Sequence, residues 1–192
     1  MSTTSKEIIL KKAFKIFAKD GYDGLSIRIL AEAIHVVPSV LYHHFTDKDA
    51  LLEAMFDGLN SKLGKNRAKL TRPQTASEML RQRIIFQLDN AEAIVAVLKY
   101  YLAYRKRFPK LKTGFVPEKG YLHIEEVLRY GMQTGEFYSP NIQEDAKVIT
   151  HAINGFLLEY YPHTPKGEEK EILVTSIHQF ITRALTKGGE MK

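Results

Sequence analysis

Four side chains that can exchange protons or bind a metal are close together in the first quarter of the sequence. They are Tyr42, His43, His44 and Lys48, within the stretch "SIRILAEAIHVVPSVLYHHFTDKDALLEAM". Such a set suits three roles: contacts with a nucleic acid, a metal or catalytic site, or a polar helix junction that needs only water. The residues around the set help to distinguish these roles.

The spacing argues against a metal or catalytic site. Successive residues of an α-helix point about 100° apart, so His43 and His44 diverge. The nearby carboxylates of Asp47 and Asp49 are expected to serve a helix start. The chain has no cysteine, and no Ser/His/Asp, paired-carboxylate or Cys/His arrangement has catalytic spacing. We therefore expect no metal, no cofactor and no enzymatic activity, while His44 stays open between a packed histidine and a phosphate contact.

The composition is that of an ordinary globular protein. The 192 residues are 44% hydrophobic and 26% charged, enough for one or two domains with a real core. The longest apolar run, from Ala93 to Leu98, is far shorter than the roughly 20 residues of a membrane span. With no secretory signal at the start, we expect a cytoplasmic protein without a membrane partner. The net charge of +6 makes an anionic partner plausible.

Apolar residues recur at helical spacing along almost the whole chain, and no stretch alternates long enough to predict a sheet. We expect an all-α fold of about nine helices. The first should run from about Lys6 to Lys19 and end at Asp20-Gly21, because glycine readily adopts the left-handed turn past a helix end. The later helices should cover residues near 75–89, 90–108, up to 133, 141–161 and 167–187.

A short helix pair follows the first helix. Ser26 should cap a helix whose apolar stripe begins at Ile27, and Pro38 should begin the next, since proline suits a first helical turn. Only residues 35–37 join the two helices. Helices joined by so short a turn must cross steeply, which is the geometry of a helix-turn-helix.

In that motif the second helix enters the major groove of DNA. Leu41 and Phe45 are one helical turn apart and should point into the core. Ser39, Tyr42 and His43 should then project outward, where a phenol can donate to a phosphate oxygen.

The start of the fourth helix also points to an anion. Thr46 and Asp49 resemble a capping box, which should begin a helix that reaches Leu63 or beyond. Lys48 then lies in the first turn, where a positive charge opposes the helix dipole at a cost of about 0.3 kcal/mol. A phosphate docked at this helix start would be attracted by both the free amides and the lysine.

These residues carry a family resemblance. The stretch from Ser26 to Met55, preceded by "AFKIFAKDGYDGL", resembles the DNA-binding domain of the TetR/AcrR family of bacterial transcriptional regulators over about Lys6 to Phe56. The resemblance implies an all-helical homodimer with an N-terminal three-helix, helix-turn-helix DNA-binding domain and a C-terminal helical ligand-binding and dimerisation domain. We place the first domain at residues 1–48 and the second at 49–192.

The resemblance also implies roles for single residues. At positions where the family holds phosphates stand Ser26, Tyr42, His44 and Lys48. At positions from which it reaches base edges stand Arg28, Val37, Pro38, Ser39 and His43. Two departures matter: His35 stands where the turn usually holds glycine, and Val37 stands where Ser or Thr is common, so the helix cap hydroxyl is missing.

The last two helices carry two apolar faces. One line runs from Ile142 to Tyr160, and a second passes through Val148 and Gly155. A helix apolar on two faces must bury both, and a mid-helix glycine, which costs about 1 kcal/mol against alanine, suits a close backbone approach. We predict a homodimer whose interface contains Ile149, Ala152, Ile153, Gly155, Phe156, Ile177, Phe180, Ile181 and Ala184. The alternative is an internal helix pair in a monomer.

The sequence thus predicts a ligand-responsive regulator, most simply a repressor that leaves a palindromic double-stranded DNA operator when a small apolar or amphipathic effector binds. The candidate effector-binding residues are Phe86, Tyr101, Tyr104, Tyr130 and Asn154. Two alternatives remain at this point. One is a helical enzyme that processes a small molecule and keeps a vestigial DNA-binding domain, and the other is an architectural DNA binder without an effector.

Overall fold

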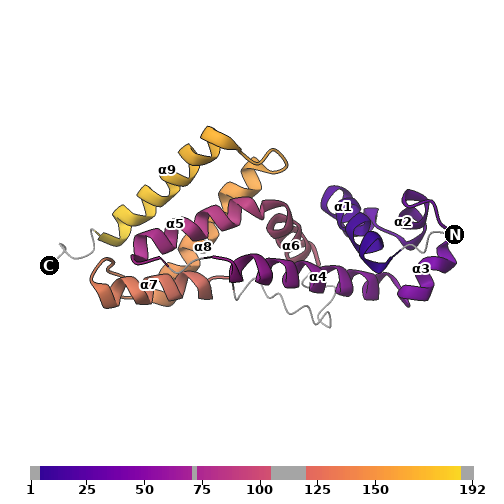
Figure 1. Ribbon diagram of the computed structural model, residues 1–192, viewed down its shortest axis with the longest axis horizontal. Helices are drawn as coiled ribbons and strands as arrows, with labels where there is room; N and C mark the ends of the chain where they lie inside the picture. The colour runs from indigo at the N-terminus through magenta and orange to yellow at the C-terminus, as the bar shows by residue number, and fades with distance from the viewer. Residues whose placement is uncertain (1–4, 71–72, 105–119, 187–192) are drawn as a thin grey trace. The chain divides into compact units, whose positions relative to one another are not determined.

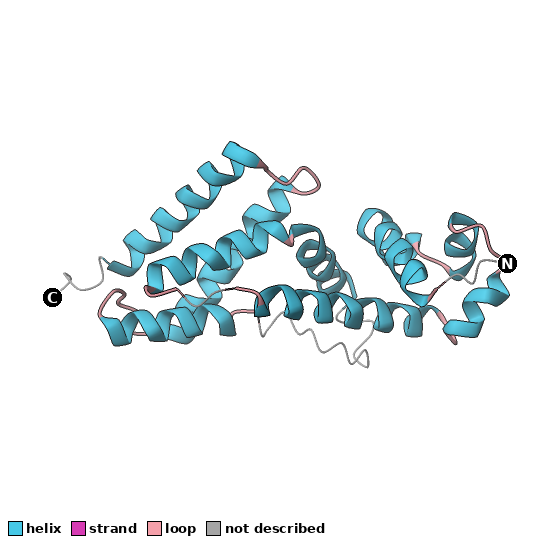
Figure 2. Cartoon of the chain, in the orientation of Figure 1, coloured by secondary structure: helices cyan, strands magenta, loops and turns pink. Residues whose placement is uncertain are grey.

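The computed structural model describes residues 5–70, 73–104 and 120–186, with the side chains of residues 60 and 100–104 left out. Within these ranges every regular element is an α-helix (Figures 1 and 2), which confirms the predicted all-α fold. The helices are α1 (Lys6–Gly24), α2 (Ile27–Ala33), α3 (Pro38–His44), α4 (Lys48–Ala68), α5 (Ala76–Asp89), α6 (Ala91–Tyr104), α7 (Leu122–Thr134), α8 (Ile142–Tyr160) and α9 (Gly167–Thr186). Among the described residues, no helix is long and apolar enough to cross a membrane.

Contacts divide the chain into two compact units. The N-terminal unit contains residues 5–65 and 96–104 of the described chain, and the C-terminal unit contains residues 66–95 and the described part of 116–192. Helix α4 therefore belongs to the first unit over most of its length and to the second at its end. The domain boundary that we predicted between residues 48 and 49 falls in the first turn of α4 and stays a prediction.

The core of the N-terminal unit is built from the apolar stripes of its helices. Ile9 and Phe17 of α1, Leu30 of α2 and Leu41 of α3 are all buried. The Phe17 ring meets the Phe56 ring of α4 edge to face, with centroids 5.3 Å apart. Each such buried side chain contributes about 1.5–3 kcal/mol, so this core holds the three short helices in place.

Two of the predicted helix signals are present as expected. Gly21 has a positive φ of 71° and interrupts α1, and residues 22–24 add one more turn before the chain leaves the helix. Ser26 caps α2, because its Oγ accepts the backbone N–H of Ile29 at 3.1 Å.

The start of α4 differs from the prediction. The capping box of Thr46 and Asp49 is wrong by one residue, because Asp47 Oδ1 accepts the backbone N–H of Ala50 at 2.7 Å and the helix begins at Lys48. Asp49 instead accepts the phenol O–H of Tyr22 at 3.0 Å. Aspartate caps a helix at least as well as threonine, so Asp47 can take the role that the prediction gave to Thr46.

The C-terminal unit packs α5 against α7 and α9, and α7 against α8. A complete capping box, formed by Thr75 and Glu78, begins α5. Gly131 of α7 lies against the buried ring of Phe137, whose backbone N–H donates to the Gly131 carbonyl at 3.1 Å. Side chains of α5, the start of α6, α7, α8 and α9 share one core, which is mostly aliphatic and includes Phe137.

Candidate functional site

The outward face of α3 is exposed and its inward face is buried. Tyr42 is 56% exposed and Val37, just before the helix, is 63% exposed, whereas Leu41 is completely buried. Pro38, Ser39 and His43 are exposed as well. The predicted division between a core face and a free face of this helix is therefore present.

A strained turn sets the direction of α3. His35 has a φ of 58°, a left-handed conformation that glycine adopts without strain and that histidine adopts only occasionally. The backbone N–H of Val36 donates to the Ala31 carbonyl at 3.0 Å and closes the turn. Val37 occupies the cap position of α3 without a side-chain hydrogen bond, and Pro38 follows in the first turn. The turn therefore keeps the glycine geometry although the sequence departs from glycine.

Lys48, at the start of α4, contacts Tyr22, a partner that the sequence did not reveal. Its Nζ lies 3.6 Å from the centroid of the Tyr22 ring, a cation–π contact. The Tyr22 hydroxyl donates in turn to Asp49. Tyr22 precedes Lys48 by more than twenty residues, so no local spacing could have shown this arrangement. It places a restrained positive charge beside the first turn of the helix.

The remaining predicted phosphate contacts have mixed surroundings. Ser26 uses its oxygen as the α2 cap, and its hydroxyl hydrogen can still be donated to an anion. Arg28 is exposed in the first turn of α2. His44 is half-buried, with its ring centroid 6.2 Å from that of Phe45. His44 therefore stays open between packing and phosphate contact.

Residues 9–55 match the family model described as bacterial regulatory proteins of the tetR family. The helix-turn-helix segment belongs to the TetR family. The HTH-type transcriptional repressor AcnR of Corynebacterium glutamicum is 40% identical over 53 residues, which are 28% of each chain. The chain thus spans little more than a quarter of this relative's length.

Solved structures of the TetR family share the fold of nearly the whole chain. A regulatory protein of Rhodococcus RHA1 has a TM-score of 0.70 at 20% identity, over 96% of this chain and 97% of that one. The regulator FadR of Bacillus subtilis, solved in complex with stearoyl-CoA, has a TM-score of 0.73 at 17% identity, over 92% and 97%. These proteins are named as transcriptional regulators, which agrees with the prediction of a non-enzymatic protein.

Beyond the TetR-family segment, the predicted effector residues are scattered over the C-terminal unit. Phe86 of α5 is buried, Tyr130 of α7 is half-buried and donates its O–H to the Gln74 carbonyl at 2.9 Å, and Asn154 of α8 is half-buried. The side chains of Tyr101 and Tyr104 lie outside the described residues. The effector prediction therefore stays untested.

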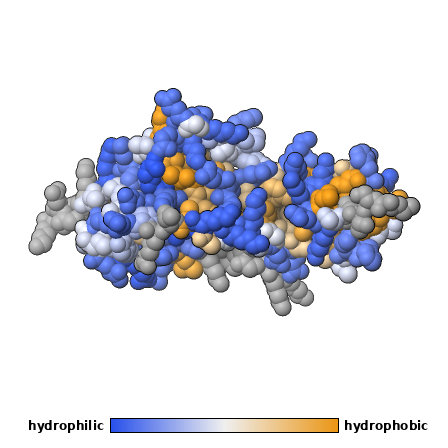
Figure 3. Space-filling model, in the orientation of Figure 1, coloured by the Kyte–Doolittle hydropathy of each residue, from blue (hydrophilic) through white to orange (hydrophobic). Residues whose placement is uncertain are grey.

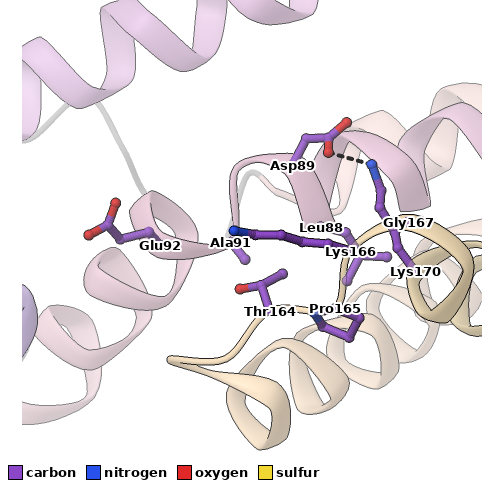
Figure 4. Close-up of a pocket in the computed structure, with 9 residues that line it drawn as sticks. All are labelled: Leu88, Asp89, Ala91, Glu92, Thr164, Pro165, Lys166, Gly167 and Lys170. Carbon is purple, nitrogen blue, oxygen red and sulfur yellow. Dashed lines mark hydrogen bonds and ion pairs between the residues drawn. The ribbon is translucent and has the colours of Figure 1, made fainter.

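A surface pocket of about 360 Å³ lies where the loop at residues 164–167 meets the end of α5 and the start of α6 (Figure 4). Lys170 forms an ion pair with Asp89 at its edge, and Glu92 and Lys166 add charges of both signs. None of the predicted effector residues lines this pocket. Four charged side chains among its lining residues do not suit a purely apolar effector.

A polar cluster that the sequence did not reveal lies beside Phe86. We call it the arginine cluster; its members are Arg67 of α4, Arg83 and Gln87 of α5, and His123 of α7. The Arg67 guanidinium carbon lies 5.4 Å from the centroid of the Phe86 ring. The members come from three helices, and the sequence pattern on each helix gave no signal that they would meet.

The pKa of His123 is lowered to about 4, mainly because the ring is buried and secondly because the positive charges of Arg67 and Arg83 lie near it. The unfolded chain binds this proton near pH 6.5, so it gains a proton before the folded protein does. The stabilisation by neutral His123 is therefore complete above pH 6.5 and is lost as the pH falls toward 4. We expect the melting temperature of the wild type to drop more between about pH 7.5 and 5 than that of His123→Gln, as measured by circular dichroism. Equal drops in the two proteins would contradict this assignment.

The predicted dimer residues fall into two groups. Ile149, Ile153, Ile177 and Ile181 are buried in the core of their own unit. They share this core with side chains of α5 and α7, and their place in a dimer interface stays a prediction. Ala152, Gly155, Phe156, Phe180 and Ala184 are exposed.

The exposed group lies in apolar surroundings. Phe180 is 73% exposed, and Val148 and Ile172 are nearly as open. Figure 3 shows hydrophobic side chains at the surface along α9. A Cβ added at Gly155 would meet no atom within 4 Å in the described part of the chain, so no described residue requires a glycine there. These exposed residues are the predicted interface residues that remain accessible on the surface of the described subunit.

Proposed function

We propose that the protein is a homodimeric, ligand-responsive transcriptional repressor of the TetR family that acts in the cytoplasm. The observation that supports this best is the free outer face of α3 in a segment that matches the family. The name of AcnR, a repressor, supports the sign of regulation.

On DNA, phosphates position the protein and base edges select the site. The Tyr42 phenol and the Lys48 ammonium are proposed to hold phosphates, together with the Ser26 hydroxyl and His44. Arg28, Val37, Pro38, Ser39 and His43 are proposed to face the bases. An arginine that forks onto guanine discriminates by about 1–3 kcal/mol, and Val37 can touch a thymine methyl group.

The dimer is proposed to form through the exposed apolar residues of α8 and α9. An exposed phenylalanine and a glycine with free space above it suit a helix from a second copy, which would cover both. A two-fold dimer presents two recognition helices to half-sites about 34–36 Å apart, which explains the expected palindrome.

The effector is proposed to bind in the C-terminal unit, as stearoyl-CoA is bound by FadR according to the name of that structure. Helix α4 links the events, because it carries Lys48 at its first residue and enters the C-terminal unit at its end. A coupling of about 1–3 kcal/mol would reduce operator affinity by one to two orders of magnitude.

The DNA contacts can be tested by gel shift on the DNA that flanks the coding region, at two salt concentrations. Tyr42→Ala and Lys48→Ala are each expected to weaken binding about tenfold on every sequence bound, and Lys48→Ala should reduce the salt slope by about 1. Lys19→Ala removes the same charge from an exposed position outside the predicted set and should bind as the wild type does. Unchanged binding by both test variants would refute the proposed interface.

A further inference from the structure

We infer that the arginine cluster binds an anionic group of the effector, a carboxylate or a phosphate, with an apolar body of the ligand against Phe86. This inference rests on the proposed function, because it names the chemical class of the effector. The sequence suggested Phe86 but none of the four polar residues, and the inference rests on their meeting from α4, α5 and α7.

The arginine cluster contains buried polar atoms that have no partner. Arg67 Nε, Arg83 Nη1 and Gln87 Oε1 are all buried and lack a hydrogen-bond partner among the residues described. The Arg83 side chain is only 16% exposed. Buried polar groups in native proteins are nearly always hydrogen-bonded. Two of these atoms lie one helical turn apart on α5 and the third lies on α4, so together they indicate that a binding partner is missing.

The charges of the cluster show which kind of partner would fit. Arg67 and Arg83 repel each other, and burial together with that repulsion lowers the pKa of Arg67. Among the described residues, an ion pair of the cluster joins Arg83 Nη2 to Glu126 Oε2 at 3.4 Å, and the Glu126 side chain is mostly exposed. It leaves Arg83 Nη1 and Arg67 Nε unpaired. Within the described part of the chain, Glu126 is the carboxylate that pairs with Arg83, so a second negative charge would be stabilised beside the two guanidinium groups.

The geometry of the donors suits an oxyanion. Guanidinium groups offer parallel N–H donors that match the oxygens of a carboxylate or phosphate, and such charge-assisted hydrogen bonds are the strong ones. His123 stays neutral near pH 7 and can donate a ring N–H. The Gln87 amide can turn to present its N–H₂ group to the same anion. A metal cation is disfavoured by the two positive charges.

An apolar surface adjoins these donors. The Phe86 ring is buried and lies under the Arg67 guanidinium, so a ligand that reaches the cluster also reaches aromatic surface. A ligand with an acidic head and a hydrocarbon body would satisfy both. Arg67 lies in the last turn of α4, the helix that begins with Lys48, so an anion that draws Arg67 toward Arg83 acts directly on that helix.

The test uses calorimetric titration of the full-length protein with three eight-carbon probes: octanoate, octyl phosphate and neutral 1-octanol. At least one anionic probe should bind tenfold or more tightly than octanol, which corresponds to about 1.4 kcal/mol. The tighter of the two anions identifies the head group as a carboxylate or a phosphate. Octanol binding equal to that of both anions, or no detectable binding of either anion, would overturn the inference.

Variants locate the site. Arg67→Gln and Arg83→Gln keep a polar side chain that can donate hydrogen bonds, but they shorten it and remove the charge, and each should lose the preference for the anion while octanol binding stays the same. Arg81→Gln is the matched control, since Arg81 lies two residues before Arg83, is more exposed and pairs with Glu171 at the surface. Retention of the anion preference by both test variants would overturn the inference.

Two further measurements keep the result interpretable. Circular dichroism establishes that each variant is folded, and nuclear magnetic resonance of the His123 ring should show its pKa rise when the anion binds, because a negative charge offsets the two arginines. Gel shifts with the same probes separate the two proposals. If octanol releases the operator as well as the anions do, the regulator stands and the anion site fails. If the wild type binds no DNA, the regulator fails and the titration still decides the site.

Discussion

Replacing Phe180 by aspartate is expected to convert the dimer into monomers and to weaken operator binding at least 100-fold, with the subunit still folded. The side chain is 73% exposed, so the subunit core does not depend on it. In the proposed interface it is a central aromatic residue, and such residues dominate binding energy. A buried, unpaired carboxylate in its place would be strongly unfavourable. In a dimer, binding of one subunit to its half-site gives the other subunit an effective concentration of about millimolar at the second half-site. Separated subunits lose this advantage, because each binds its half-site independently.

Sedimentation velocity and gel shift measure the two parts of this result. Leu122→Asp is the control, because Leu122 of α7 is also exposed and apolar but lies outside the predicted interface. The control should stay dimeric and bind DNA as the wild type does. Dimers of Phe180→Asp at micromolar concentration would show that another surface holds the subunits together.

Phe137→Ala is expected to destabilise the C-terminal unit by about 3–5 kcal/mol, the range for truncation of a buried phenylalanine. The Phe137 ring is 5% exposed and belongs to the core that α5, α7, α8 and α9 share. A loss of this size is a large part of the roughly 5–15 kcal/mol that holds a domain together. Urea unfolding followed by circular dichroism measures it, and a loss below 1 kcal/mol would contradict the packing described.

The same ring explains Gly131. A Cβ added at that position would lie 2.7 Å from Phe137 Cγ, so Gly131→Ala should cost about 1–3 kcal/mol by overpacking. In the Phe137→Ala background the contacts with the ring atoms at 2.4 and 2.7 Å are gone and only the Cβ of residue 137, at 2.9 Å, remains close, so Gly131→Ala should cost less there than in the wild type. Additive effects of the two substitutions would show that they do not share this contact.

The helices that the sequence predicted correctly are those set by local chemistry. Ser26, Pro38 and Gly21 act through the backbone within one turn of themselves, so their effect is readable from neighbouring residues. The inward and outward faces of α3 follow from helical periodicity in the same way. Local signals of this kind do not depend on which other helix packs nearby.

The features that the sequence did not reveal depend on contacts between distant segments. Tyr22 reaches Lys48 and Asp49 only after α1 and α4 pack together. The arginine cluster needs three helices side by side. On α8 and α9, periodicity found the apolar lines, but it could not tell which residues enter the subunit core, as Ile149, Ile153, Ile177 and Ile181 do.

One helix carries both Lys48 at its first residue and Arg67 in its last turn. If the effector lowers the affinity for DNA through α4, thermodynamic reciprocity requires operator binding to lower the affinity for the effector by the same factor. A promoter-bound molecule would then be a poorer sensor than a free one. The effector concentration that gives a half-maximal response would therefore rise with the number of operator copies in the cell.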